Sequence, residues 1–386
     1  MVNKVILVIN AGSSSIKYSI FDHEKLTLEY QGIIQDIFEA PILTVLDAKG
    51  SMIFKKNIKK GYETSFIELF DWLKNLPYKF ILTAVGHRIV HGGKDFYAPT
   101  KITNRVFENL MALIPLAPLH QPHNLEAIKI ISKIYPDLLQ IGCFDTAFHK
   151  TQNKLATLFA IPRYLTEEGI VRFGFHGLSY EYIASVLHEY LGKNCQDKVI
   201  VAHLGNGASM CAMHFQESVA TSMGLTALDG LMMGTRCGSI DPGVILYLMQ
   251  EKKYSADKIE KLLYEQSGLL GVSNISNDVR VLEQSKSLEA KEALDLFCFR
   301  AARELSALVT ALRGCDAIVF TAGIGENSAI VRQGICKWLD WLGVQLDEEA
   351  NLSQKPIISH QASKVLVAII PTNEEYMIAK HTKTLI

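Results

Sequence analysis

Apolar runs interrupted by short polar turns mark the expected strands of this chain. The first run, Val5–Ile9, is rich in β-branched residues and ends at the polar stretch Asn10–Ser15, after which an alternating strand continues to Phe21. The same order of apolar strand, polar turn and apolar strand returns in Val199–Met213, about half of the 386-residue chain further on. The pattern predicts a duplicated domain, and a chance similarity between two hairpins is the alternative.

Both turns contain groups that can hold phosphate. In the first turn, Gly12 lets the backbone approach an anion, the hydroxyls of Ser13–Ser15 can donate to phosphate oxygens, and Lys17 adds a positive charge. Asn10 offers a neutral oxygen to a metal ion. Taken alone, the stretch fits a polar β-hairpin equally well, and its recurrence in the second half favours the phosphate interpretation.

Other segments follow strand or helix periodicity. Tyr30–Lys60 alternates weakly and predicts more antiparallel strands. Apolar residues recur at helical spacing in Thr64–Leu76 and Lys291–Leu312, and Val365–Ile370 is expected to be a buried strand. Helix starts are predicted from capping chemistry at Ser65 with Glu68, Ser179, Asp241 before Pro242, and Thr372 with Glu375.

The composition excludes a bulk attraction to polyanions. Thirty-nine Lys and Arg balance 40 Asp and Glu, so neither nucleic acid nor an anionic membrane is an expected partner. No apolar stretch approaches the roughly 18 residues of a membrane span, and no signal peptide is expected. The seven cysteines, at positions 143, 195, 211, 237, 298, 315 and 336, form no C-x-x-C pair, which predicts reduced thiols in a cytoplasmic protein.

Two polar residues of the first half occupy strand positions that suit a ligand. In a strand over Val85–Val90, Arg88 and Val90 would share one face and offer a guanidinium and an apolar wall to a carboxylate; an edge arginine facing water is the alternative. Asp145 follows the expected strand Ile141–Phe144, where ligand-facing residues of α/β folds lie, and an N-cap role is an equal alternative.

Histidines in the middle of the chain lie in loop-like contexts. The proline-rich segment Ile114–Asn124 is not expected to be a helix interior, and its His120 and His123 are interpreted as loop residues lining a cleft rather than as metal ligands. His176 stands between glycines without an apolar helix face, which suits donation to a developing negative charge. Arg236 is the one cation of a glycine-rich loop.

The last third contains nucleotide-type features that are weak one by one. Asp278 and Arg280 suit a ribose or purine but equally an exposed turn. Gly323 and Gly325 follow the expected strand Ala317–Phe320 without completing G-x-G-x-x-G, and the next two residues, Glu326 and Asn327, are expected to open a helix. Glu374 alone would be an ordinary acidic residue of a helix first turn.

Together these segments resemble the acetate kinase family, the acetate and propionate kinases of the sugar kinase, heat-shock chaperone and actin superfamily. The resemblance runs nearly end to end in the family's order and spacing. It rests on VINAGSSSIK, GHRIVHGG, FDTAFH, RFGFHG, HLGNGAS, MGTRCGSIDPG, TAGIGENS and PTNEEY.

The resemblance implies an α/β fold of two duplicated actin-like (ribonuclease H-like) domains with a nucleotide cleft between them. The first domain would span residues 1–145, with the C-terminal helix 372–386 packed back on it, and the second would span residues 146–371. A homodimer formed through the second domain is also implied.

The family's site residues carry over onto matching positions. Asn10 and Glu374 would serve Mg²⁺, with Mn²⁺ as an alternative. The catalytic set would be Arg88, Asp145, His176 and Arg236, and the acyl pocket would contain Arg88, Val90, Leu119, His120 and Phe175. ATP or ADP would contact Lys17, His203, Leu204, Gly205, Asn206, Gly207, Asp278, Val279, Arg280, Gly323, Ile324, Gly325, Glu326 and Asn327.

The implied reaction is reversible, in-line transfer of a phosphoryl group from ATP to acetate or another short carboxylate. A carboxylate is ionised near neutral pH, with a reference pKa of about 4, so no general base is needed. A nucleotide-driven switch protein of the same superfamily and a non-catalytic relative are the alternatives. The sequence predicts no appended peptide-binding region, which the switch protein would need. It also keeps the matching residues, which a non-catalytic relative would have lost.

The sequence departs from the family pattern in one loop. Where the family commonly has T-P-L-E-G, this chain has Ala227 and Asp229 in TALDG, and where it has G-T-R-S-G-D, this chain has Cys237 and Ser239. Because the proline normally helps to line the acyl pocket, these departures concern acyl specificity and loop order. Arg236 itself is retained.

Overall fold

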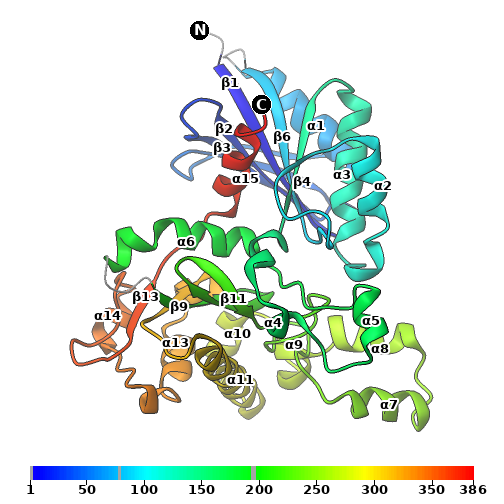
Figure 1. The fold of residues 1–386 in the computed structure, drawn as a ribbon. Coiled ribbons are helices and arrows are strands. Elements are labelled where there is room, and N and C mark those ends of the chain that lie inside the picture. Colours follow the sequence, from blue (N-terminus) through cyan, green and yellow to red (C-terminus); the bar gives the residue numbers. More distant parts are fainter. Residues whose placement is uncertain (1–2, 77–79, 193–196) are drawn as a thin grey trace. The chain divides into compact units, whose positions relative to one another are not determined.

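The computed structural model describes residues 3–76, 80–192 and 197–386, and Cys195 lies outside these ranges (Figure 1). The chain divides into a first unit, Met1–Ala147 with Asn373–Ile386, and a second unit, Phe148–Thr372. Among the described residues, no helix has the length and apolar character needed to cross a membrane.

The first unit is organised around an eight-stranded sheet in the order β5-β4-β3-β2-β1-β6-β8-β7. The predicted first hairpin is the antiparallel pair β1–β2, and β1, β6 and β8 run parallel. The elements of this unit are β1 (Asn3–Ala11), β2 (Ile16–Asp22), β3 (Leu28–Gln35), β4 (Ile42–Asp47), β5 (Met52–Asn57), α1 (Tyr62–Lys74), β6 (Phe80–Ile89), β7 (Thr100–Lys101), α2 (Asn104–Met111), α3 (Gln121–Ile134), β8 (Leu139–Phe144) and α15 (Glu374–Lys383).

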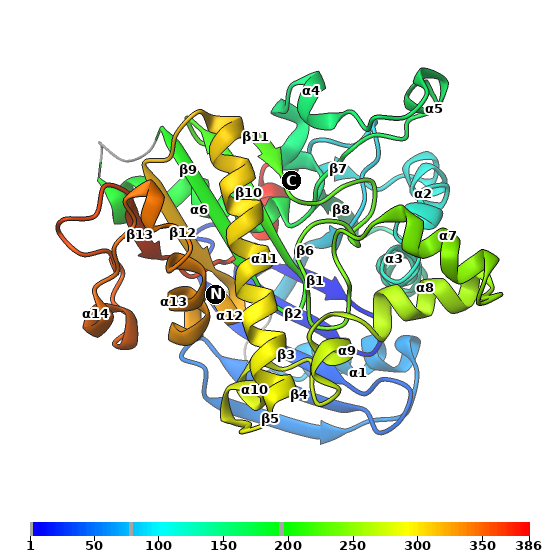
Figure 2. The same ribbon diagram turned by 90° about the horizontal axis from the view of Figure 1, so that it is seen from below.

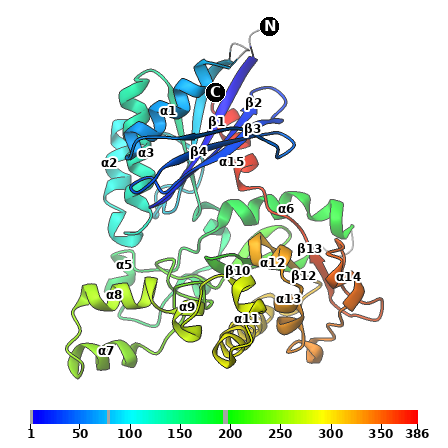
Figure 3. The ribbon, with the colours of Figure 1, turned by 180° about the vertical axis from the view of Figure 1, so that it is seen from behind.

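Helices meet both faces of this sheet. Alternate β1 side chains, such as Leu7, belong to a core cluster with residues of α1 and α3. On the other face α15 approaches β6 closely, since a Cβ at Gly86 would lie 2.2 Å from Oγ1 of Thr382 and 2.7 Å from Cγ2 of Ile378. Figures 1 and 3 show α15 beside β1 and β6, with α1 and α3 on the opposite side of the sheet.

The second unit repeats five of these strands. Its sheet has the order β11-β10-β9-β12-β13, with β9, β10 and β11 antiparallel and β9, β12 and β13 parallel. The strands β3-β2-β1-β6-β8 of the first unit have the same order and directions. The predicted duplication is therefore confirmed by the topology.

Helices also enclose the second sheet. Helix α6 joins the core cluster of β9 through Ile183 and Leu187, and the long α11 lies across β9, β10 and β11 (Figure 2). The elements are α4 (Lys154–Thr157), α5 (Arg163–Glu167), α6 (Gly177–Leu191), β9 (Lys198–Leu204), β10 (Ala208–His214), β11 (Glu217–Thr221), α7 (Pro242–Gln250), α8 (Ala256–Glu265), α9 (Gly268–Ser273), α10 (Val279–Gln284), α11 (Leu288–Leu312), β12 (Ala317–Thr321), α12 (Ala322–Asn327), α13 (Ala329–Cys336), α14 (Glu348–Leu352) and β13 (Leu366–Ile369).

Three of the predicted helix caps are wrong because each hydroxyl has another partner. Ser65 lies inside α1 and donates to the carbonyl of Gly61 at 2.9 Å. Ser179 lies inside α6, two residues after that helix begins. Thr372 donates to Ser179 at 2.8 Å, and Asn373 caps α15 instead. The prediction at Asp241 is confirmed, since its carboxylate accepts from the N–H of Gly243.

Two further boundaries differ from expectation. His123, which was expected in a loop, lies in α3, and this helix begins at Gln121. Pro122 stands in its first turn, where no N–H is required, so the prediction that the prolines lie outside a helix interior holds. Glu326 and Asn327 end α12 instead of opening a helix, and Ser328 caps the following α13.

Candidate functional site

The first candidate phosphate turn joins β1 to β2. Asn10 and Lys17 stand directly opposite each other in the antiparallel register, and the turn is closed by a hydrogen bond from the N–H of Gly12 to the carbonyl of Ser15 at 2.8 Å. The hydroxyl of Tyr62 donates to the carbonyl of Gly12. An amide oxygen and a cation are thus held side by side at the end of the hairpin.

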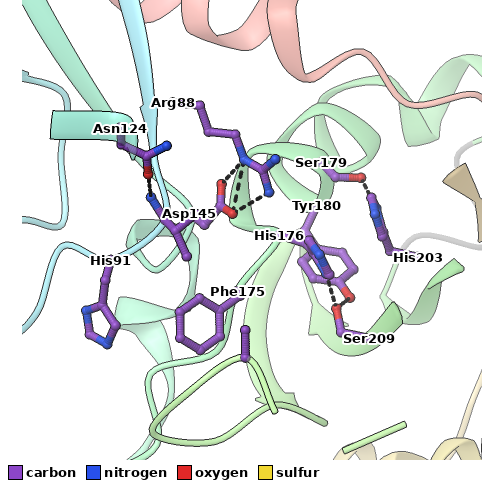
Figure 4. A network of polar contacts seen from close by, with 12 residues as sticks. Arg88, His91, Asn124, Asp145, Phe175, His176, Ser179, Tyr180, His203 and Ser209 are labelled. Atoms are coloured by element: carbon purple, nitrogen blue, oxygen red, sulfur yellow. Dashed lines mark hydrogen bonds and ion pairs between the residues drawn. The ribbon is translucent and has the colours of Figure 1, made fainter. Parts of the chain in front are cut away.

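A bidentate ion pair joins the ends of two neighbouring strands. Arg88 near the end of β6 donates to Asp145, which directly follows β8, through Nε to Oδ1 at 3.0 Å and Nη2 to Oδ2 at 2.7 Å (Figure 4). The Asp145 side chain is 2% exposed and that of Arg88 is 19% exposed. Desolvation lowers the pKa of Arg88, but Asp145 and Glu374 outweigh it and raise that pKa above its ordinary value. Asp145 therefore acts in an ion pair with Arg88, and not as the helix N-cap that was the alternative prediction.

Glu374 lies in the electrostatic field of this pair. It begins α15, the helix that packs on the Gly86 face of β6. Desolvation raises the pKa of Glu374 above its usual range, and Asp145 and Glu375 raise it further, while Arg88 and Lys17 act in the opposite direction. A cation bound beside these carboxylates would relieve their mutual repulsion.

Two carboxamides that the sequence reasoning missed fix the backbone around Arg88. The Asn124 side chain accepts from the N–H of Val90 at 3.0 Å and donates to the carbonyl of Ala11 at 2.8 Å. Gln121 accepts from the N–H of His91 at 3.2 Å and donates to its carbonyl at 3.0 Å. Both lie in the first turn of α3. They were not predicted because no helix was expected in this proline-rich segment.

The predicted acyl-pocket residues are divided between the two units. Val90 is buried just beyond β6, while Leu119 and His120 are half-buried just before α3. Phe175 belongs to the second unit and is 1% exposed, with its carbonyl accepting from Nε2 of His149 at 3.0 Å.

Two histidines are stacked beside the second candidate phosphate turn. The rings of His176 and His203 lie 4.2 Å apart at 17°, and Figure 4 shows their contacts with Ser209 and Ser179. His176 has φ 58° and ψ 24°, a left-handed conformation that non-glycine residues rarely adopt. A Cβ at Gly207 would lie 3.4 Å from His176 Nε2 and 3.9 Å from Arg236 Nη1. His176 and Arg236 therefore converge on one turn glycine.

A pocket of about 620 Å³ lies in the second unit beside this turn. Its lining combines backbone-exposing glycines with the polar side chains of Asn206, Asp278 and Asn327. The predicted nucleotide residues on the wall are Gly205, Asn206, Asp278, Val279, Arg280, Gly323, Ile324 and Asn327. Asp278 and Arg280 pair with each other at 2.6 Å.

The other predicted nucleotide residues of this unit support the wall. Leu204 is buried at the end of β9, and Gly325 is buried in α12. The Glu326 carboxylate accepts from the N–H groups of Ala322 at 2.8 Å and Thr372 at 3.2 Å. Glu326 thus closes the strand-to-helix turn after β12.

The acetokinase family model matches residues 5–380. The chain belongs to the acetokinase family.

Relatives of known name and structure agree with this assignment. The chain is 50% identical to an acetate kinase of Rhodopseudomonas palustris over 98% of its length and 97% of the relative, and 46% identical to an acetate kinase of Methylocella silvestris over 100% and 98%. A propionate kinase structure from Francisella tularensis matches with TM-score 0.93 at 36% identity, covering 99% of this chain and 100% of that one. An acetate kinase structure from Porphyromonas gingivalis gives TM-score 0.88 at 35% identity, covering 99% of each chain. The predicted α/β fold with two actin-like domains is confirmed.

The departures from the acetokinase pattern meet in the loop that contains Arg236. Arg236 Nη1 donates to the carbonyl of Ala227 at 3.0 Å. Asp229 accepts from Ser239 at 2.7 Å and from Arg172 at 2.8 Å. The aspartate at position 229 and the serine at position 239 therefore bond to each other and connect the two sides of this loop.

Proposed function

We propose that this chain transfers the γ-phosphoryl group of ATP to acetate, reversibly, with acetyl phosphate and ADP as the other reactants. The observation that carries the proposal is the 50% identity, over nearly the full length, to a relative named acetate kinase. The buried Arg88–Asp145 pair and the polar pocket of the second unit supply groups that suit a carboxylate and a nucleotide.

In this proposal Arg88 binds the acetate carboxylate, and Asp145 orients the guanidinium. Val90, Leu119, His120 and Phe175 form the pocket for the methyl group. The ionised acetate oxygen attacks the γ-phosphorus as the bond to ADP breaks, so no proton has to be removed. His176 and Arg236 stabilise the charge on the equatorial phosphoryl oxygens.

In this proposal, groups of both candidate turns and of the pocket bind the nucleotide. Lys17, His203 and Gly205–Gly207 contact the phosphates, and the pocket between α10 and α12 receives the adenosine, with Gly325 and Glu326 behind its wall. The convergence of His176 and Arg236 on Gly207 supports this assignment.

Magnesium fits the oxygen donors of Asn10 and Glu374. Mg²⁺ favours carboxylate and neutral oxygen ligands and usually keeps waters and substrate phosphates in its shell, and the repulsion among Glu374, Asp145 and Glu375 favours a cation there. When bound, the ion neutralises phosphate charge. Mn²⁺ has the same preference for oxygen and is the alternative ion.

Propionate is a second candidate acyl substrate. The propionate kinase structure from Francisella tularensis matches this chain with TM-score 0.93, and Ala227 removes ring atoms where the family commonly has proline. A looser pocket would admit one more methylene, a change that alters specificity by about 10–200-fold.

The test is hydroxylamine trapping of acyl phosphate with Mg-ATP and equal concentrations of acetate, propionate or butyrate. Acetate-dependent product that falls steeply towards butyrate is expected. A maximum with propionate would establish the second candidate, and Ala227→Pro should then move the preference back to acetate. Bound ATP without acyl phosphate from any acid would overturn the proposal and favour a nucleotide-driven switch.

We also propose a cytoplasmic homodimer. Helix α7 supports it, because Val244, Leu246, Tyr247 and Met249 are 39–54% exposed on one short helix. The six cysteines of the described residues form no disulfide, which suits a reducing compartment. Light scattering should give twice the 43.0 kDa chain mass, and Leu246→Glu with Tyr247→Lys should give the monomer.

A further inference from the structure

Two chains of hydroxyl groups end at the stacked histidines. In each chain an outer hydroxyl group contacts the hydroxyl of a serine, and this serine contacts Nδ1 of a histidine ring (Figure 4). Adjacent residues of α6, Ser179 and Tyr180, take part in the two chains. The helix therefore organises both histidines at once.

The proton order of the His203 chain follows from its first link. The hydroxyl of Thr372 donates to Oγ of Ser179 at 2.8 Å, and Ser179 Oγ lies 2.8 Å from Nδ1 of His203. Since Ser179 accepts from Thr372 and has one hydroxyl proton, that proton is the one available to Nδ1. Nδ1 is then the acceptor, and the neutral imidazole has its proton on Nε2.

The His176 chain has the same order for a chemical reason. The hydroxyls of Tyr180 and Ser209 form a short hydrogen bond, and Ser209 Oγ lies 2.8 Å from Nδ1 of His176. A phenol, with a reference pKa of about 10, is a better donor than an aliphatic alcohol. We therefore assign Tyr180 as the donor to Ser209, which leaves the hydroxyl proton of Ser209 for Nδ1.

The remaining ring nitrogens face the candidate phosphate turn. A Cβ at Gly205 would lie 3.9 Å from Nε2 of His203, and one at Gly207 would lie 3.4 Å from Nε2 of His176. The absence of side chains at these glycines leaves both Nε2 atoms beside the turn backbone. An Nε2–H at each position would be a donor suited to an anionic oxygen held at this turn.

We infer that Thr372, Ser179, Tyr180 and Ser209 are positioning residues that fix both histidines as Nε2–H tautomers. His203 then donates to a nucleotide phosphate, and His176 donates to the transferring phosphoryl group. This inference rests on the proposed function for the identity of the acceptors, while the tautomers themselves are a property of the protein without substrate. An Nδ1–H tautomer would present a lone pair to phosphate and repel it.

Histidine NMR tests the tautomers directly. Protein labelled with ¹⁵N-histidine gives long-range ¹H–¹⁵N patterns that distinguish the two tautomers at a pH about 1.5 units above the ordinary histidine pKa of about 6.5. The chain has twelve histidines. The signals of His176 and His203 are identified as those that disappear in His176→Gln and in His203→Gln. Both residues are expected as Nε2–H, and a majority Nδ1–H form of either one in the wild type overturns the inference whatever the variants do.

Single-hydroxyl variants test the two chains separately. Thr372→Val should shift His203 towards a tautomer mixture and leave His176 unchanged, and Tyr180→Phe should do the reverse. Tyr190→Phe is the matched control, being the same change ten residues along α6, about 15 Å away. Unchanged tautomers in both test variants, or equal shifts in the control, would contradict the inference.

Kinetics separate this inference from the proposed function. Loss of the outer hydrogen-bond partner of a metal-ligating histidine costs about 10–100-fold in metal affinity or activity, and we expect a similar scale for a histidine that binds phosphate. We expect Thr372→Val to raise the KM for ATP and Tyr180→Phe to lower kcat, each by about tenfold or more. A wild type with the expected tautomers but no acyl phosphate would refute the function alone, whereas active enzyme with Nδ1–H histidines would refute the inference alone.

Discussion

Arg88 binds Asp145 through Nε and Nη2, so Nη1 is the guanidinium nitrogen that this carboxylate does not engage. The pair connects two adjacent parallel strands, since Arg88 lies in β6 opposite Cys143 of β8 and Asp145 directly follows β8. A cation held this rigidly can present its remaining edge to a second carboxylate without reordering. The orientation of Arg88 is therefore set by Asp145 before substrate arrives.

Asp145→Asn should separate orientation from binding. The amide keeps the shape but offers Arg88 a single neutral acceptor, and a small misplacement of a reacting group can cost about 10²-fold. We expect kcat to fall by about that factor with the KM for acetate nearly unchanged. Glu68→Gln, which breaks the more exposed Lys56–Glu68 pair, should alter neither parameter. An increase in KM at constant kcat would show that Asp145 acts in binding.

Arg236→Ala should lose about 10³-fold or more in kcat, the scale of removing a cation from a phosphoryl transition state. Its Nη1 lies near Gly207 and also donates to Ala227, so a thermal melt must accompany the assay. Arg303→Ala, an exposed arginine on α11, is the control with unchanged rate. A loss below tenfold in folded Arg236→Ala protein would exclude Arg236 from the chemical step.

Two glycines of α12 should respond differently to the same substitution. A Cβ at Gly323, on the pocket wall, meets nothing within 4 Å, whereas one at Gly325 would lie 3.4 Å from the backbone carbon of Phe320. Gly323→Leu should raise the KM for ATP about tenfold or more at unchanged stability, because it fills the pocket. Gly325→Leu should lose about 1–3 kcal/mol of stability through overpacking. Equal ATP affinity in Gly323→Leu would remove the pocket from the nucleotide site.

Buried histidines should weaken the fold in mild acid. Desolvation lowers the pKa of His87 to about 4, and that of His149 likewise to about 4. Between about pH 6.5 and pH 4 the unfolded chain binds protons that the folded chain does not, so the free energy of unfolding falls as the pH falls. Each histidine contributes at most about 1.4 kcal/mol per pH unit.

Urea unfolding at several pH values measures this slope. His149→Gln should reduce the slope over that window, and the exposed His188→Gln should leave it unchanged. An identical slope in His149→Gln and the wild type would mean that His149 is protonated in the folded protein.

Patterns that depend on neighbours in the chain were predictable from the sequence. The β-branched runs became β1 and β9, the amphipathic helix appeared as Leu288–Leu312, and the aspartate before proline capped α7. Asp145 was identified as a candidate because ligand-facing residues of α/β folds follow the ends of strands, and Arg88 because it shares a strand face with the apolar Val90.

Contacts between distant residues were not predictable in this way. Ser179 and Thr372 have ordinary N-cap chemistry, yet they bond to each other across 193 positions. Asn124 reaches back 113 positions to Ala11. A hydroxyl or carboxamide can satisfy a local helix end or a remote backbone group, and only the folded chain determines which one.

The approach of α15 to Gly86 fixes when the first unit can be completed during synthesis. Thr382 and Ile378, the residues that would touch a side chain there, are translated long after the first part of the unit ends at Ala147. At about 5–20 residues per second, the ribosome needs roughly 10–50 s after residue 147 to deliver them. Throughout that interval the nascent protein lacks both Glu374 and the helix that covers this part of β6. A chain whose translation stopped before residue 374 would lack both, so translation through α15 is a precondition for the proposed metal site.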